Sequence, residues 1–260
     1  MIPFFQINSI VSGPITIQAW GLFVALGMLI GLLAAQYLAR RYLLSSQVIL
    51  DVGLWAIIGG LVGGRLFFVW FYALDYYLTN PLDILKFWQG GASSLGGFIG
   101  ALVAVWLFIK RRHFSWQEFL PYLDMSSVGL WLGWGIGRVG CFLIHDHPGR
   151  LTNFSLAVNF PNGMRHDLGL YESIFSFFIF IIFALLFKKL VKIGWGLVTG
   201  FSFGLYAVGR FFLDFLRATD LDYSDAKYFY LTPAQWGMLV IMLTLTFWVI
   251  FAKIKRVKNS

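Results

Sequence analysis

The segment between Tyr206 and Arg217 carries four polar side chains at helical spacing within an otherwise apolar stretch. They are Tyr206, Arg210, Asp214 and Arg217, separated by four, four and three positions. This spacing places all four on one face of a helix. Arg210 and Asp214 can neutralise each other, and the remaining arginine and tyrosine leave donors for a ligand. Because arginine forks match phosphate geometry and stay charged, the pattern predicts a phosphate-binding site.

A second cluster of ionisable residues lies in the segment 137–150, GRVGCFLIHDHPGR. Its members are Arg138, His145, Asp146, His147 and Arg150. Histidine is suited to accept a proton near neutral pH, so His145 and His147 are candidate general bases. With His166 and Asp167 the cluster also offers metal ligands, but the His-Asp-His spacing is not a zinc signature. We therefore predict neither a metal site nor a cofactor.

The composition places these residues in a membrane protein. Only 12% of the 260 residues are charged and the mean hydropathy is +0.75, whereas soluble domains carry about 25% charged residues. Seven apolar windows run at about 15–38, 48–72, 92–109, 119–142, 170–187, 195–216 and 234–252. Lipid offers the backbone no hydrogen-bond partner, so each window must be helical. We predict an all-α, polytopic fold with seven transmembrane helices in one domain, residues 1–260.

The basic residues predict how the chain is oriented in the membrane. Twelve of the 20 lysines and arginines directly follow the first, third, fifth and seventh windows. They are Arg40, Arg41, Lys110, Arg111, Arg112, Lys188, Lys189, Lys192, Lys253, Lys255, Arg256 and Lys258. By the positive-inside rule the N-terminus is outside and the C-terminus is cytoplasmic. The net charge of +8 therefore marks cytoplasmic loops and not a nucleic-acid partner.

In this orientation the charges within the windows share one depth. Arg65, Arg138, Glu172, Arg210 and Asp214 all fall in the outer half of the bilayer, beside an extracytoplasmic head segment, 143–169. A charge in the bilayer costs about 3 kcal/mol, so such groups usually face a partner or a wet cavity. We predict one polar site for a phospholipid headgroup, although Arg65 alone could instead extend to the headgroups. Within the head segment, the turn signal Pro161-Asn162-Gly163 predicts a hairpin.

Several ordered motifs resemble those of the bacterial prolipoprotein diacylglyceryl transferases. The family signature matches Gly137-Arg138, Gly140, Phe142, Asp146 and Gly149-Arg150. Further matches are Gly63-Gly64-Arg65, His166, Leu170-Tyr171-Glu172, Tyr206, Arg210, Asp214, Arg217, Leu231-Thr232 and Gln235. The resemblance covers nearly the whole chain. It implies a seven-span helical bundle in the bacterial cytoplasmic membrane, with an active site toward the outer leaflet.

The resemblance also implies a reaction and roles for the residues. The family moves the diacylglyceryl group of phosphatidylglycerol to the lipobox cysteine of a preprolipoprotein, the first step of lipoprotein maturation. Arg138 and Arg210 would hold the phosphate, and Asp146 and Asp214 would orient them or the headgroup. The substrate supplies the attacking sulfur, so Cys141 is interpreted as a packing residue. Further candidate phospholipid ligands are Arg65, Arg150, His166, Glu172, Tyr206 and Arg217.

The chain departs from the family pattern at positions that bear on which residue acts as the general base. Leu95 stands where the family commonly has a histidine, and Cys141 replaces the signature asparagine. Trp20 replaces a tyrosine, and both signature acids are aspartate where glutamate is usual. Leucine cannot accept a proton. We therefore hypothesise that His145 and His147, which flank Asp146, supply the missing imidazole.

Two other functions remain as alternatives. Leu95 and Cys141 are compatible with a phospholipid-binding relative that has lost the chemistry or changed its acceptor. A seven-span transporter or receptor is the other alternative. Its binding site would be expected near the midplane, whereas the charged groups here gather toward one face.

Overall fold

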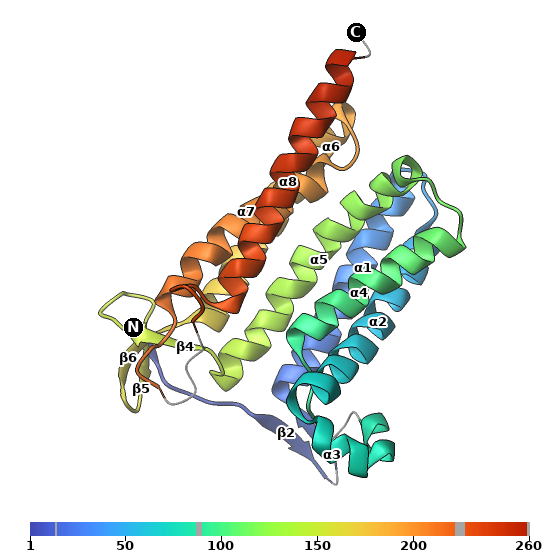
Figure 1. Cartoon of the computed structure of the whole chain (residues 1–260). Helices are drawn as coiled ribbons and strands as arrows, with labels where there is room; N and C mark the ends of the chain where they lie inside the picture. The colour runs from blue at the N-terminus through green and yellow to red at the C-terminus, as the bar shows by residue number, and fades with distance from the viewer. Residues whose placement is uncertain (14, 87–89, 222–226, 259–260) are drawn as a thin grey trace. The chain divides into compact units, whose positions relative to one another are not determined.

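The computed structural model describes residues 1–13, 15–86, 90–221 and 227–258 (Figure 1). Within helices and strands, the side chains of residues 12, 15 and 248–258 lie outside the described part, and these include the C-terminal lysines of the charge pattern. The chain forms two compact units. Residues 1–35 with 127–260 make the first unit, and residues 36–126 make the second.

The first unit is built on three whole helices and parts of two others. Its elements are α1 (Ala19–Arg41) up to residue 35, α5 (Trp116–Ile144) from residue 127, α6 (Leu168–Ile193), α7 (Leu197–Leu213) with the 3₁₀ turn η3 (Asp214–Leu216), and α8 (Pro233–Lys258). α7 packs against both α6 and α8. Each predicted apolar window of this unit coincides with a helix. The exception is the start of the first window, where residues 15–18 form a strand because β-branched residues favour one. The helix begins at Ala19.

Glycines let the helices of the first unit approach at backbone distance. A Cβ atom on Gly133 of α5 would lie 2.4 Å from the carbonyl oxygen of Gly27 on α1, and one on Gly129 would lie 2.2 Å from that of Gly31. Gly169, at the start of α6, packs equally closely on the backbone of α5 at Phe142. Small residues are the usual means of close packing in membrane helices. These contacts fix α5, which carries Arg138, between α1 and α6.

We expect Gly133→Ala to destabilise the protein by about 1–3 kcal/mol, because the new methyl group must push the Gly27 backbone away. The matched control is Gly137→Ala, one turn further along α5, where the nearest atom to the added Cβ would be 3.8 Å away. Denaturant unfolding of both variants in detergent compares the two positions. Equal stability losses would contradict the close α1–α5 contact.

Two small sheets accompany the helices of the first unit. The larger has the strand order β1 (Ile2–Pro3), β5 (Val158–Phe160), β6 (Gly163–Asp167) and β4 (Pro148–Leu151). The other is a hairpin of β2 (Ser9–Ser12) and β3 (Ile15–Gln18). The predicted hairpin is confirmed, since Phe160 pairs with Gly163 across the connection Pro161–Asn162. The chain is mostly helical, as predicted, and carries in addition strands near its N-terminus and in the segment 148–167.

The second unit is a helix pair with an irregular connection. It contains α2 (Ser46–Tyr72), α3 (Leu74–Thr79), the 3₁₀ turn η1 (Pro81–Leu85) and α4 (Ser94–Arg111). Residues 36–41 of α1 and 116–126 of α5 also belong to it. α2 and α4 pack along a glycine stripe, in which Gly59 and Gly63 face Gly100. Leu95, at the start of α4, is 58% exposed within the structure.

Arg65 of α2 organises the connection between α2 and α4. Its side chain is buried, and its guanidinium donates to the carbonyls of Asp83 at 2.7 Å, Ile84 at 3.0 Å and Gly91 at 2.9 Å. Lys86 and Gly90 supply further carbonyl acceptors. These contacts occupy the donors of Arg65 with backbone oxygens. They give Arg65 a role in positioning a loop and do not support the prediction that it holds a phosphate.

Within the described part of the chain, five helices are long and apolar enough to cross a membrane, namely α1, α2, α4, α5 and α6. α7 has 17 residues, and the apolar part of α8 whose side chains are described runs over Pro233–Phe247. The protein is therefore a polytopic, predominantly helical membrane protein. The short windows predicted from 92 and 170 belong to complete helices of 18 and 26 residues.

Candidate active site

Glu172 is the centre of an ion-pair network to which three helices of the first unit contribute. Its buried carboxylate lies 2.9 Å from Nη2 of Arg138 and 3.2 Å from Nε of Arg210. The Tyr206 hydroxyl donates to the same carboxylate at 3.4 Å. Arg138 comes from α5, Glu172 from α6, and the other two from α7. One acidic side chain thus holds two guanidinium groups close together.

Asp214 extends this network beyond the end of α7. Its Oδ1 accepts a hydrogen bond from Nη1 of Arg210 at 2.6 Å and lies 3.2 Å from Nε of Arg217. The Thr232 hydroxyl donates to its Oδ2. Thr232 and Gln235 cap the start of α8 through reciprocal backbone-to-side-chain bonds of 3.0 and 3.2 Å. The expected Arg210–Asp214 pair is confirmed, and α8 fixes its geometry.

Aromatic side chains surround the guanidinium of Arg138. The Trp134 ring centroid lies 5.1 Å from its central carbon, a cation–π distance. Trp131 packs on the Tyr206 ring with centroids 4.7 Å apart. The Arg138 side chain nevertheless stays 16% exposed.

Glu172 and Asp214 bring the guanidinium groups of Arg138, Arg210 and Arg217 together. Arginine forks match the geometry of phosphate oxygens and stay charged. The network is therefore chemically suited to a phosphodiester group.

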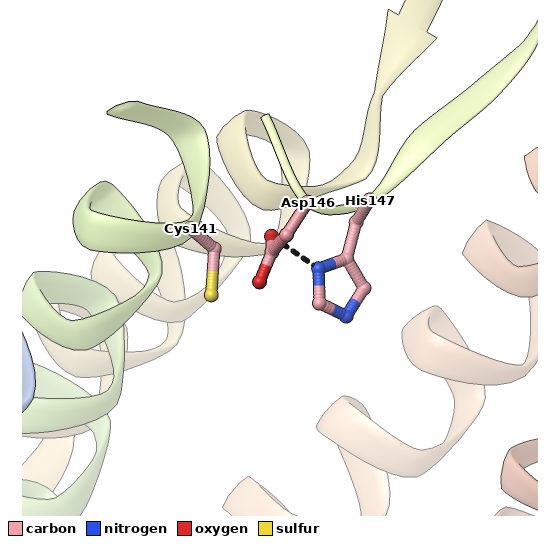
Figure 2. A group of neighbouring side chains, drawn as sticks. All are labelled: Cys141, Asp146 and His147. Carbon is pink, nitrogen blue, oxygen red and sulfur yellow. Dashed lines mark hydrogen bonds and ion pairs between the residues drawn. The ribbon is translucent and has the colours of Figure 1, made fainter. Parts of the chain in front are cut away.

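Cys141, Asp146 and His147 form a second group, which we term the thiol–imidazole cluster (Figure 2). Cys141 lies in the last turn of α5, and the other two residues lie in the turn before β4. Asp146 and Nδ1 of His147 share a hydrogen bond, and their side chains are 31% and 24% exposed. Nη1 of Arg138 is 3.7 Å from the Cys141 sulfur. The cluster therefore adjoins the ion-pair network.

His145 lies apart from this cluster although it is adjacent in sequence. Its side chain is 1% exposed, and Nδ1 pairs with Oδ2 of Asp167 at 2.6 Å. The rings of Phe4, Phe5, Phe142 and Phe160 surround it. Asp167 also caps α6 by accepting from the Leu170 amide at 2.9 Å. These contacts tie the end of α5 to the start of α6 and do not support the prediction that His145 is a catalytic base.

The remaining predicted ligands lie around β4 and β6. Arg150 is exposed on β4. Nδ1 of His166 pairs with the Tyr171 hydroxyl at 2.9 Å, and burial lowers the pKa of His166, so this imidazole is neutral at pH 7. Gly149 bridges to the backbone of Arg217, which places β4 beside the end of η3. Contact with Arg217 brings this strand to the edge of the ion-pair network.

Two contributions to the site were not predicted. The Thr232–Asp214 bond joins residues 18 positions apart on different elements, so spacing along one helix gives no signal for it. The cation–π contact of Trp134 with Arg138 joins residues four positions apart. That i,i+4 spacing was visible in the sequence and could have indicated the contact.

Comparisons with known proteins identify the family of the chain. The family model described as prolipoprotein diacylglyceryl transferase matches residues 7–252. Three relatives are named phosphatidylglycerol–prolipoprotein diacylglyceryl transferase. That of Mesorhizobium japonicum is 33% identical over 84% of this chain and 81% of its own length. That of Finegoldia magna is 33% identical over 80% and 82%, and that of Nitrosomonas europaea is 31% identical over 95% and 90%. The chain therefore belongs to the prolipoprotein diacylglyceryl transferase family.

Proposed function

We propose that this transferase moves the diacylglyceryl group of phosphatidylglycerol onto the lipobox cysteine of preprolipoproteins, the first step of bacterial lipoprotein maturation. The observation that carries the proposal is the pair of guanidinium groups, Arg138 and Arg210, that the buried Glu172 holds close together. Two planar forks suit the phosphodiester of the donor. The names of the relatives support the same donor and acceptor.

The reaction requires a nucleophile and a stabilised leaving group. The acceptor thiolate attacks the glycerol carbon that bears the phosphate, and a carbon–sulfur bond forms. The carbon–oxygen bond breaks, and its electron pair leaves on the phosphate oxygen of glycerol phosphate. Arg138 and Arg210 stabilise the charge that grows on this oxygen, while Glu172 and Asp214 hold the two guanidinium groups in place.

His147 is the candidate base for the acceptor thiol. The thiolate is the reactive form, so the thiol proton must be removed. The partly exposed imidazole of His147 is oriented by Asp146, whereas His145 is enclosed by aromatic rings. An imidazole held by a carboxylate is a suitable proton acceptor near neutral pH.

We expect His147→Gln to lower the transfer rate by about 10²–10³-fold at pH 7, within the range typical of a lost general base. The loss shrinks as the pH rises, because hydroxide then generates more thiolate without the base. A pH–rate profile with a synthetic lipobox peptide measures both effects. A rate reduction of the same size at every pH would assign His147 a structural role instead.

The membrane arrangement is part of the proposal. All seven predicted windows would cross the bacterial cytoplasmic membrane, with α7 and α8 completing the bundle. The positive-inside rule places the N-terminus outside, the C-terminus in the cytoplasm and the head segment, 143–169, outside. The donor would enter from the outer leaflet, where a signal peptide with its lipobox cysteine also presents its thiol.

The direct test uses purified protein in vesicles with and without phosphatidylglycerol. A lipobox peptide is added, and mass spectrometry detects the diacylglyceryl adduct. The expected adduct forms only with phosphatidylglycerol, requires the peptide cysteine, and disappears in Arg138→Ala. Lipid binding without an adduct would instead favour a phospholipid-binding relative with lost chemistry or a changed acceptor, the alternative suggested by Leu95 in place of the family histidine.

A further inference from the structure

We infer that the thiol–imidazole cluster of Cys141, Asp146 and His147 is a binding site for a thiophilic divalent cation such as Zn²⁺. Among the residues that the structure describes, it is the one group of three or more His, Cys, Asp or Glu side chains whose ligand atoms converge. These three atoms lie within 4.8 Å of one another. Neither the reaction nor the relatives' names call for a metal, so this site goes beyond the proposed function. Because the cation would occupy the imidazole that is proposed as the base, metal binding is expected to inhibit transfer.

The geometry needs only a small adjustment to close around a cation. Zinc bonds of about 2.3 Å to sulfur and about 2.0 Å to nitrogen or oxygen place tetrahedral ligands roughly 3.3–3.7 Å apart. The cluster must therefore contract by about 1 Å. Cys141 is buried on α5, whereas Asp146 and His147 are partly exposed in a turn. The movement can thus be made by two side chains outside the helix.

The charges of the cluster suit a divalent cation. The thiolate and the Asp146 carboxylate supply two negative charges, and a neutral imidazole completes three ligands. The Arg138 guanidinium lies 3.7 Å from the sulfur, and its charge is paired with Glu172 at 2.9 Å, which reduces its repulsion of the cation. Bound metal and its three ligands would therefore be electrically neutral.

The contact between Asp146 and His147 shows that two of the three ligand groups already face each other. The carboxylate and Nδ1 of the imidazole share a hydrogen bond, and a cation would take the place of the shared proton. Figure 2 shows the Asp146 carboxylate between the Cys141 thiol and Nδ1 of His147. Water would occupy the fourth position of a tetrahedral zinc ion.

Metal titration of the purified protein in detergent tests the site without donor lipid or acceptor peptide. We expect one equivalent of Zn²⁺ to bind in competition with a chromophoric chelator. Cys141→Asn, which introduces the residue of the family signature, should weaken binding at least tenfold, as should His147→Ala. The control His113→Ala, at an exposed histidine of the second unit, should bind like the unchanged protein.

Cobalt provides a readout specific for the sulfur ligand. Co²⁺ bound to the unchanged protein should give a thiolate-to-metal charge-transfer absorption, and Cys141→Ser should lack it. Absence of stoichiometric Zn²⁺ binding, or binding that Cys141→Asn and His147→Ala leave unchanged, would overturn the inference. Because neither measurement involves transfer, a failure here is distinguishable from a failure of the proposed function.

Discussion

Replacing Arg138 with lysine is expected to lower kcat/KM for diacylglyceryl transfer by about 10²–10³-fold, the size of effect typical when one preorganised donor to a developing oxyanion is lost. Arg138 combines three contacts: an ion pair with Glu172 at 2.9 Å, a cation–π contact with Trp134, and a side chain that remains 16% exposed to a ligand. Lysine keeps the charge. It cannot present a planar fork to the phosphate while it also pairs with Glu172.

The kinetic comparison separates the fork from the charge. Arg138→Lys and Arg138→Ala are assayed beside Arg112→Lys, where the arginine is 58% exposed and pairs with Asp51 in the second unit. The Arg112 variant should transfer at the normal rate. If Arg138→Lys retained more than about a third of the activity, the bidentate role of Arg138 would be refuted, and its charge alone would suffice.

The second large effect is expected on stability. Glu172→Gln removes the carboxylate that two buried guanidinium groups share and should lower the free energy of unfolding by about 3–5 kcal/mol. The loss is large because Arg138 and Arg210 would lose their common counter-ion. This cost exceeds the net stabilisation that the ion pairs themselves provide. Glu172 is fully buried and lies 2.9 and 3.2 Å from the two guanidinium groups, so its removal breaks a buried ion pair.

Denaturant unfolding in detergent measures this loss against an exposed pair. Arg112 pairs with Asp51 at 2.7 Å, and the Arg112 side chain is 58% exposed. Asp51→Asn should therefore cost no more than about 1 kcal/mol. Glu172→Gln and Asp51→Asn of equal stability would show that water or lipid already screens the charges of the network. Activity is measured separately, because the unfolding midpoint is independent of turnover.

The membrane character and the main charged residues of the site could be predicted from the sequence. Apolar windows of membrane-spanning length have one stable backbone solution, so helices at those positions follow from chemistry alone. Arg210 and Asp214 are four positions apart on one helix, and local geometry makes them neighbours. The turn at Pro161–Asn162 is likewise local, and the hairpin it predicts is present.

Long-range contacts decided which of the equivalent residues belong together. His145 and His147 are two positions apart, yet packing encloses one in aromatic rings and leaves the other beside Cys141. Arg65 resembles Arg138 in sequence context, but the connection between α2 and α4 folds its carbonyls around the Arg65 guanidinium. The strand β1 was not predicted because its pairing depends on a partner far along the chain, as when Ile2 pairs with Val158. Sequence alone determined which side chains could carry charge within a membrane, because that depends on residue type and local period. Only the tertiary structure decided which of them meet, because burial and distance depend on how separate segments pack.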